Sequence, residues 1–198
     1  MEKYSVVYID DSPESALTKY LDTQFHNDNY EIECHEIIFD PTTQGYESLL
    51  QNTTITSANV IFIDSRLFEN RNAASGKFTG EEFKLVLKKF FPFIEVIVIT
   101  QNGTEGSIEK IPKYDKSTGM TASEYYSTIL PKHLDSAIDS IRQYRSLANL
   151  VESNDSWEKL LKEKVLATLN GTNPYDELAK TDIDTLIEAF KEIQVSLE

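Results

Sequence analysis

The sequence predicts an α/β protein in which helices cover both faces of a doubly wound parallel sheet. The first observation is a set of three short runs of β-favouring apolar residues, at 6–9, 60–63 and 96–99. Because these runs are apolar on both faces, they are typical of buried parallel strands. The second observation is that segments with helical spacing lie between the runs. This alternation is the pattern of crossover connections in a parallel sheet.

The first strand and the helix after it organise the rest of the chain. The run that begins at Val6 ends in Asp10 and Asp11, and residues 12–15 (Ser-Pro-Glu-Ser) then open a helix. Proline suits the first turn of a helix, where its missing N–H is not needed. Apolar residues recur at helical spacing up to about His26. We therefore expect a strand, a pair of carboxylates and a helix, in that order.

The next elements follow from alternation and from turn residues. Residues 30–35 alternate apolar and polar side chains, as an edge strand does. The Asp-Pro pair at 40–41 ends this strand, and the apolar residues of 46–50 indicate a short second helix. Residues 59–64 are then predicted to form the second buried strand, which ends in Asp64.

A long loop, a helix and a third buried strand are expected next. Residues 65–79 are polar, and a helix with one apolar face is predicted to begin at Gly80 and to stop at Pro92. The strand at 95–100 follows and ends in a hydroxyl, that of Thr100.

The second half of the predicted sheet is less regular. Residues 101–106 are too few and too rich in glycine for a helix, so we expect the fourth helix of a doubly wound fold to be shortened or absent. A weaker strand is expected at 107–111. After Pro131, apolar residues at helical spacing up to Val151 indicate a long helix.

The sequence predicts two parts, a domain at residues 1–150 and a C-terminal α-helical extension at 151–198. Asp155 and Ser156 resemble a helix start, and Gly171 is expected to close that helix. Apolar stripes further along predict two or three helices in the extension as a whole.

The composition is that of a globular protein with a strong negative charge. The net charge is −14, from 33 acidic and 19 basic residues, so we expect contact with neither nucleic acid nor an anionic membrane. No apolar run reaches membrane-spanning length, and the first residues lack the pattern of a signal peptide. The single cysteine, Cys34, cannot form an internal disulfide. We therefore expect a cytoplasmic location.

Polar residues end the predicted strands, and in a parallel sheet those ends meet at one edge. They are the pair Asp10 and Asp11, then Asp64, Thr100 and, after the weaker strand, Lys113. Two adjacent carboxylates repel each other unless a cation lies between them, and ligands that are all oxygen favour Mg²⁺. The alternative is a plain Asp-Asp turn in which one side chain caps the following helix.

This ordered set of residues resembles the receiver domain of two-component response regulators. The resemblance covers residues 3–150, and the spacing from Gly106 to Lys113 is similar to that of the stretch before the family's lysine. It implies a flavodoxin-like sheet of five parallel strands in the order 2-1-3-4-5. It also implies a phosphoryl donor, which would be a histidine kinase or a phosphotransfer protein.

The resemblance implies a role for each carboxylate. Asp64 would be the phosphoacceptor and would form an acyl phosphate. Asp11, Asp64 and the backbone carbonyl of Arg66 would hold Mg²⁺, and Asp10 would act through a coordinated water. Beyond self-catalysed phosphorylation and dephosphorylation of Asp64, no enzymatic activity is expected.

Lys113 and Thr100 complete the implied site, and some nearby residues depart from the family pattern. Lys113 would pair with Asp64 and then with a phosphate oxygen, while Thr100 would hydrogen-bond another oxygen. Lys116 is a rival for the role of Lys113 if the fifth strand shifts in register. Lys110 stands where the family usually has a switch aromatic, and Gln101 stands where a small residue is common.

Two other functions stay open. A pseudo-receiver has the same fold but binds protein partners without being phosphorylated, and Lys110 and Gln101 favour this alternative. A Mg²⁺-dependent phosphatase or phosphotransferase is the other, although Arg66 stands where such enzymes usually place a second Asp. The output of a receiver is expected to be a protein effector, and residues 131–198 offer helices through which a homodimer could form.

Overall fold

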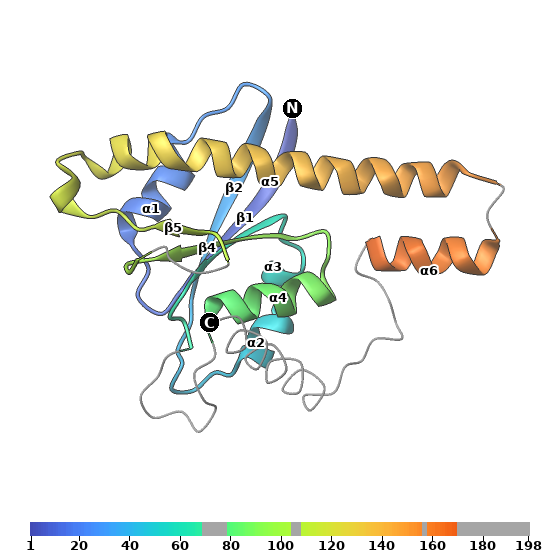
Figure 1. Ribbon diagram of the computed structural model, residues 1–198, viewed down its shortest axis with the longest axis horizontal. Helices are drawn as coiled ribbons and strands as arrows, with labels where there is room; N and C mark the ends of the chain where they lie inside the picture. Colours follow the sequence, from blue (N-terminus) through green and yellow to red (C-terminus); the bar gives the residue numbers. More distant parts are fainter. Residues whose placement is uncertain (69–78, 104–107, 156–157, 170–198) are drawn as a thin grey trace.

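The computed structural model describes residues 1–68, 79–103, 108–155 and 158–169, and it has the predicted α/β architecture. Five strands form one sheet in the order β2-β1-β3-β4-β5, and every neighbouring pair is parallel. The strands are β1 (Glu2–Asp10), β2 (Tyr30–Ile38), β3 (Val60–Asp64), β4 (Glu95–Thr100) and β5 (Lys110–Pro112). The order 2-1-3-4-5 is therefore confirmed, and it is a flavodoxin-like topology (Figure 1).

Alternate side chains of the strands supply two separate apolar layers. On one face, Val7 and Ile9 of β1 pack with Ile61 and Ile63 of β3, and on the other face Tyr8 packs with its own neighbours. All five residues of β3 are buried, because this strand lies in the middle of the sheet with a layer on each side. The runs that are apolar on both faces are thus the central strands, as predicted.

Helices cover both faces of the sheet (Figure 1). The layer that contains Tyr8 is closed by α1 (Ser15–Lys19), the π-helix η1 (Tyr20–Gln24) and α5 (Ala122–Ser153). The opposite layer is closed by α2 (Tyr46–Leu50), α3 (Thr53–Thr56) and α4 (Gly80–Phe90). The described residues between β4 and β5, 101–103 and 108–109, form no helix, in agreement with the prediction of a shortened or absent fourth helix.

Several element boundaries differ by a few residues from the predicted ones. The first helical segment ends in a π-helix at Gln24 rather than at His26, and β2 continues to Ile38. The fifth strand is shorter and later than 107–111, since it covers only Lys110–Pro112. It pairs with β4 through Ile99 and Ile111, so the polar residues that follow each strand still reach the same edge.

The start of the long helix at Pro131 is wrong, because α5 begins at Ala122. A capping box fixes this start: the Thr121 hydroxyl accepts a hydrogen bond from the Glu124 amide at 3.2 Å, and Glu124 accepts one from the Thr121 amide at 2.8 Å. Pro131 lies inside the helix. The two turns before it bury Tyr125, Tyr126 and Leu130, and this packing favours the longer helix.

Of the C-terminal extension, the structure describes one helix, α6 (Lys159–Leu169). It begins at Lys159 rather than at the predicted Asp155, and α5 before it runs on to Ser153. The helices predicted beyond Gly171 lie outside the described residues. No helix in the described parts of the chain is long and apolar enough to cross a bilayer.

Candidate functional site

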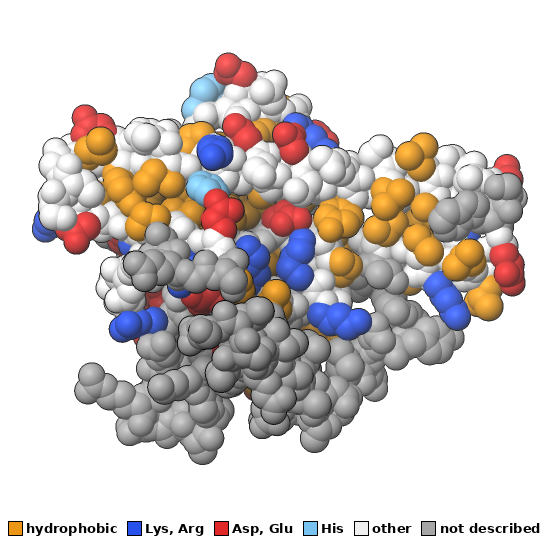
Figure 2. Space-filling view, in the orientation of Figure 1, with side chains coloured by type: hydrophobic (Ala, Val, Ile, Leu, Met, Phe, Trp, Pro, Cys, Tyr) orange, Lys and Arg blue, Asp and Glu red, His pale blue; other side chains and the backbone are white. Residues whose placement is uncertain are grey.

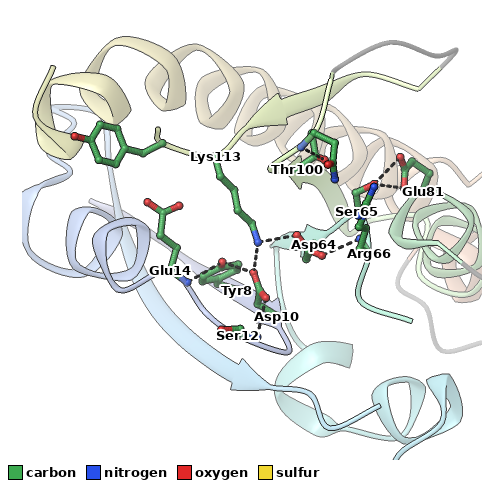
Figure 3. A network of polar contacts seen from close by, with 12 residues as sticks. Tyr8, Asp10, Ser12, Glu14, Asp64, Ser65, Arg66, Glu81, Thr100 and Lys113 are labelled. Carbon is green, nitrogen blue, oxygen red and sulfur yellow. Dashed lines mark hydrogen bonds and ion pairs between the residues drawn. The ribbon is translucent and has the colours of Figure 1, made fainter. Parts of the chain in front are cut away.

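The carboxyl ends of the strands bring a lysine and two carboxylates together. Asp10 is the last residue of β1, Asp64 is the last residue of β3, and Lys113 comes directly after β5. Figure 3 shows the Lys113 side chain extending to a point between Asp10 and Asp64. Its rival Lys116 lies in a short 3-10 helix (Lys116–Thr118) and is exposed. The lysine of this site is therefore Lys113.

Lys113 is bound by both carboxylates at once. Its Nζ lies 2.7 Å from Asp10 Oδ2 and 2.7 Å from Asp64 Oδ1, and its side chain is 5% exposed. Burial alone lowers the pKa of Lys113, but the hydrogen bonds to Asp10 and Asp64 outweigh that effect and the net shift is upward. The lysine is therefore held as an ammonium that neutralises part of the acidic edge.

Asp10 is the most heavily bonded carboxylate of the site. The Tyr8 hydroxyl donates to its Oδ2 at 2.5 Å, beside Lys113, and the Ser12 amide donates to its Oδ1 at 2.9 Å. Burial raises the pKa of Asp10, yet these three donors outweigh burial and the net pKa is lowered. Asp10 is thus fixed as a carboxylate, and Tyr8, two residues earlier on the same face of β1, orients it.

Asp11 has a different environment from Asp10. It is exposed, and its pKa is raised, first by partial burial and then by its contact with Asp10 and the negative charges of Asp10 and Asp64. Lys113 contacts the other two acids, so the acidic edge keeps an excess of negative charge at Asp11. A cation at this position would relieve that repulsion.

Asp64 is held by its neighbours on both oxygens. Its Oδ1 contacts Lys113, and its Oδ2 accepts a hydrogen bond from the Arg66 amide at 2.8 Å. The following residue is tied to the sheet and to α4, since the Ser65 amide donates to the Ile99 carbonyl at 2.8 Å and the Gly80 amide donates to the Ser65 carbonyl at 2.9 Å. Gly80 has no room for a side chain, because a Cβ there would collide with the carbonyl oxygen of Asp64.

Thr100 lies at the end of β4 and is buried. Its hydroxyl oxygen accepts a hydrogen bond from the Asn102 amide at 3.1 Å, and its carbonyl accepts one from the Lys113 amide at 2.7 Å. Thr100 therefore fixes the backbone of Lys113, whose side chain reaches the carboxylates. Gln101, next in the chain, is exposed.

Lys110 has a specific partner in place of the aromatic packing that the resemblance leads one to expect. Its Nζ lies 3.1 Å from Glu81 Oε1, and Glu81 also accepts a hydrogen bond at 2.9 Å from the hydroxyl of Ser65. Both ends of the ion pair are largely buried. These contacts form a polar link between β5, the first turn of α4 and the residue after Asp64. Figure 3 shows its Ser65–Glu81 part.

The oxygen donors of the site are of the kind that Mg²⁺ binds, but they are not gathered as a ligand set. Among the described residues, no group of three or more His, Cys, Asp or Glu side chains is arranged to hold a metal ion. The chemistry nevertheless fits, because Asp11 is exposed and carries unrelieved repulsion, and each oxygen of Asp64 has a second lone pair. Asp11 and Asp64 are the direct ligands that this arrangement would offer.

Three residues near the site were not found from the sequence, namely Tyr8, Glu14 and Glu81. Tyr8 could have been noticed, because it lies on the same face of the first strand as Asp10. Glu14 and Glu81 find their partners only in the folded chain, since the Glu14 carboxylate accepts a hydrogen bond from Tyr126, 112 residues later.

No family model matches this chain, and no curated protein is similar to it in sequence. The fold and the site therefore define it as a flavodoxin-like α/β protein with a lysine clamped between two aspartates at the carboxyl edge of its sheet.

Proposed function

We propose that this chain is a phosphoacceptor receiver of a two-component or phosphorelay system, and that Asp64 accepts the phosphoryl group. The observation that carries the proposal is the position of Lys113, at 2.7 Å from both Asp64 and Asp10. An ammonium at this distance from the acceptor can neutralise a phosphoryl oxygen as soon as the group arrives, and charge neutralisation with positioning is most of what phosphoryl transfer requires.

The transfer is a displacement at phosphorus. An oxygen of the Asp64 carboxylate attacks the phosphorus of a phosphohistidine or of acetyl phosphate, and an O–P bond forms. The bond from phosphorus to the donor breaks, and the leaving imidazole or acetate keeps its electron pair. The Arg66 amide holds the other oxygen of Asp64, which orients the attacking carboxylate. Hydrolysis of this acyl phosphate is the only other chemistry that we assign to the chain.

Mg²⁺ fits this reaction, and Asp11, Asp64 and the backbone carbonyl of Arg66 are the residues that we expect to hold it. Asp10 would bind it through a water, since Lys113, Tyr8 and Ser12 already use Asp10 as an acceptor. When bound, the ion supplies positive charge to the oxygens of the transferring group. Thr100 would donate its hydroxyl proton to a phosphoryl oxygen, because the hydrogen bond from the Asn102 amide uses only the hydroxyl oxygen.

A pseudo-receiver that binds a protein partner without phosphorylation is the second candidate. It is favoured by the hydrogen bonding of Asp10, which accepts one hydrogen bond each from Lys113, Tyr8 and Ser12. An acid that is so fully bonded can serve the fold as an ion-pair partner alone. The raised pKa of Asp11, caused by partial burial and by its acidic neighbours, favours the first candidate, because a structural ion pair would not need that third acid.

Incubation of the full chain with Mg²⁺ and acetyl phosphate separates these candidates. The phosphoacceptor predicts a mass gain of one phosphoryl group that hydroxylamine removes, and this gain disappears in Asp64→Asn. A matched control is Asp28→Asn, since Asp28 is an exposed acid away from the site. If the wild-type chain gains no phosphoryl group from acetyl phosphate or from a phosphorylated transfer protein, the pseudo-receiver stands instead.

The partners of a receiver are proteins, and the C-terminal end of α5 and the start of α6 offer an apolar surface for one. Figure 2 shows apolar side chains gathered over these two helices. Exposed leucines there are Leu147 (47%), Leu150 (64%), Leu160 (57%) and Leu161 (52%). Contiguous apolar patches of this kind are uncommon on monomers. We assign this surface to a second copy of the chain, so that a homodimer would carry the signal to its effector.

Sedimentation equilibrium tests the homodimer. We expect a mass above that of one chain at high concentration, and a return to the monomer mass in Leu150→Glu. Met120→Glu is the control, since Met120 is similarly exposed but precedes the other end of α5. A monomer at all concentrations, or equal loss of association in the control, would remove the dimer from the proposal.

A further inference from the structure

Two buried tyrosines connect the phosphoacceptor site to the beginning of α5. Tyr8 lies on β1 next to Asp10, and Tyr126 lies in the first turns of α5. Both residues are almost completely buried, with 0% of Tyr8 and 1% of Tyr126 exposed. A buried hydroxyl must find hydrogen-bond partners, so the contacts of these two groups are part of what holds the site against the helix.

The first tyrosine joins Asp10 to the loop that precedes α1. Its hydroxyl donates to Asp10 Oδ2 at 2.5 Å and accepts a hydrogen bond from the Glu14 amide at 3.2 Å. Figure 3 shows Tyr8 between Asp10 and Glu14. Asp10 Oδ2 also accepts a hydrogen bond from Lys113, so Lys113 and Tyr8 share this acceptor and are linked by two hydrogen bonds.

The second tyrosine joins the same glutamate to the residue after Lys113. The Tyr126 hydroxyl donates to Glu14 Oε2 at 2.5 Å and accepts a hydrogen bond from the Tyr114 amide at 3.1 Å. Tyr114 follows Lys113 directly in the chain. The contacts therefore close a ring that runs from Lys113 through Asp10, Tyr8, Glu14, Tyr126 and Tyr114 back to Lys113.

The direction of each hydrogen bond in this ring is fixed. A backbone amide can only donate, so the amides of Glu14 and Tyr114 occupy an oxygen lone pair on each tyrosine. The single hydroxyl proton of each tyrosine is then committed to its carboxylate, that of Asp10 or that of Glu14. Neither tyrosine can turn to another acceptor without leaving a buried donor or acceptor unpaired, which is costly.

We propose that this ring, through Glu14 and Tyr126, carries the phosphorylation state of Asp64 to the start of α5. The proposal rests on the proposed function, since it names how that site is coupled to the rest of the molecule. When a phosphoryl group is bound to Asp64, the Lys113 ammonium turns toward its oxygens and away from Asp10. Asp10 then loses this donor, the hydrogen bonds of the Tyr8 hydroxyl to Asp10 and from the Glu14 amide readjust, and the bond between Tyr126 and the Glu14 carboxylate changes with them.

The side chain at position 110 favours coupling through these tyrosines over coupling through Thr100. Lys110 is bound to Glu81 by an ion pair, so no aromatic side chain stands there to follow Thr100. The helix that the ring reaches is also the longest of the described elements, from Ala122 to Ser153, and α6 packs against it. A shift of its first turns as a rigid body is transmitted to its far end.

Hydrogen exchange of the full chain tests the coupling, with phosphorylation measured in the same samples by intact mass. In the wild-type chain, treatment with Mg²⁺ and acetyl phosphate is expected to change the exchange rates of the amides at 122–130 by about fivefold, the lower end of usual coupling factors. Tyr126→Phe is expected to gain the phosphoryl group but to show no change at 122–130. Exchange rates report local opening, so they detect this uncoupling directly.

Tyr125→Phe is the matched control. Tyr125 is the adjacent tyrosine, and its hydroxyl donates to the Pro112 carbonyl at 3.0 Å, outside the ring. This variant is expected to respond like the wild-type chain. Glu14→Ala, which removes the acceptor of Tyr126, provides a second break in the ring if Tyr126→Phe fails to fold.

The outcomes separate the two proposals. A phosphorylated wild-type chain without a response at 122–130 overturns the coupling and leaves the phosphoacceptor intact. A response that persists in Tyr126→Phe or in Glu14→Ala, or that is lost equally in Tyr125→Phe, also overturns it. A wild-type chain that gains no phosphoryl group overturns the proposed function, and the coupling with it.

Discussion

Lys113 and Asp10 are 103 residues apart in the sequence, yet the ammonium of the first donates to the carboxylate of the second at 2.7 Å. The same ammonium contacts Asp64 at the same distance. One cation thus joins the ends of β1 and β3 to the residue after β5. The stability of this edge of the sheet and the chemistry that we propose for it depend on the same three side chains.

Substitution of Lys113 by methionine should destabilise the fold strongly. It leaves the carboxylates of Asp10 and Asp64 buried without their cation, and breaking a buried ion pair from one side costs about 3–5 kcal/mol. We expect a loss of about 3 kcal/mol in the free energy of unfolding, measured by urea titration. Lys116→Met, at an exposed lysine three residues later, should change stability by less than about 0.5 kcal/mol. Equal effects of the two variants would contradict the assignment of Lys113.

Substitution of Tyr8 by phenylalanine should cost stability in a pH-dependent way. A hydrogen bond to a charged group contributes about 1.5–3 kcal/mol, and the Tyr8 hydroxyl is one of the donors that lower the pKa of Asp10. A lowered native pKa stabilises the fold above the ordinary value of 3.8, and this contribution is lost as the pH falls through the lowered pKa.

The difference in unfolding free energy between Tyr8→Phe and the wild-type chain should therefore be largest at neutral pH and should decrease in acid. Urea titrations across the acid range measure it. Tyr125→Phe is again a suitable control, because its hydroxyl contacts a backbone carbonyl and no carboxylate. A difference in unfolding free energy that stays constant with pH would mean that the Tyr8 hydroxyl does not stabilise the ionised form of Asp10.

Substitution of Thr121 by alanine tests the start of α5. The variant loses the side-chain half of the capping box, which costs about 1 kcal/mol. Thr128→Ala is the control, because the Thr128 hydroxyl donates to the Glu124 carbonyl within the helix and caps nothing. Thermal unfolding compares the two variants. An unchanged melting temperature in Thr121→Ala would indicate that the helix does not begin at Ala122.

The single cysteine should be unreactive in the native protein. Burial is the main cause that raises the pKa of Cys34, from 9.0 to about 12. Native protein near pH 9 should therefore react with a thiol reagent much more slowly than urea-unfolded protein, because the thiolate is the reactive form. If the native chain were modified as rapidly as the unfolded chain, burial would not be keeping the Cys34 thiol protonated.

The raised pKa of Cys34 also predicts a stability change in alkaline solution. The contribution of the Cys34 thiol to the free energy of unfolding is complete below pH 9.0. It is lost as the pH rises toward about 12, because the thiol ionises first in the unfolded chain. The difference in unfolding free energy between the wild-type chain and Cys34→Ala should shrink over this range. Measuring the difference separates Cys34 from the tyrosines, several of which also have a raised pKa.

The central strands and the order of the sheet could be predicted from the sequence because their signal is local. Runs such as 60–63 are apolar on both faces, and only a strand in the middle of a covered sheet has that environment. The start of α5 was missed because Pro131 resembles a first-turn proline. The Thr-x-x-Glu pattern at 121–124 was a stronger signal, and it was present in the sequence.

The acidic edge was predictable for a topological reason, whereas its finer contacts were not. Parallel strands end at one edge, so Asp10, Asp64 and Lys113 could be expected together without any knowledge of side-chain packing. The bond from Tyr126 to Glu14 joins residues 112 apart and depends on how α5 crosses the sheet. No spacing rule in the sequence carries that information.

The close fit of Gly80 against the end of β3 has a consequence for how the chain tolerates change in length. The Gly80 amide is bonded to the Ser65 carbonyl at 2.9 Å, so the two ends of the connection between these residues lie next to each other. Closing such a connection becomes only slightly more costly as it lengthens, by roughly 0.6 kcal/mol for each doubling. Insertions within this connection that spare Arg66, Leu67 and Phe68 at its start should therefore leave Asp64 in place, because Arg66 holds Asp64 and the next two side chains pack in the core. Such an insertion could carry an epitope tag or a reporter domain.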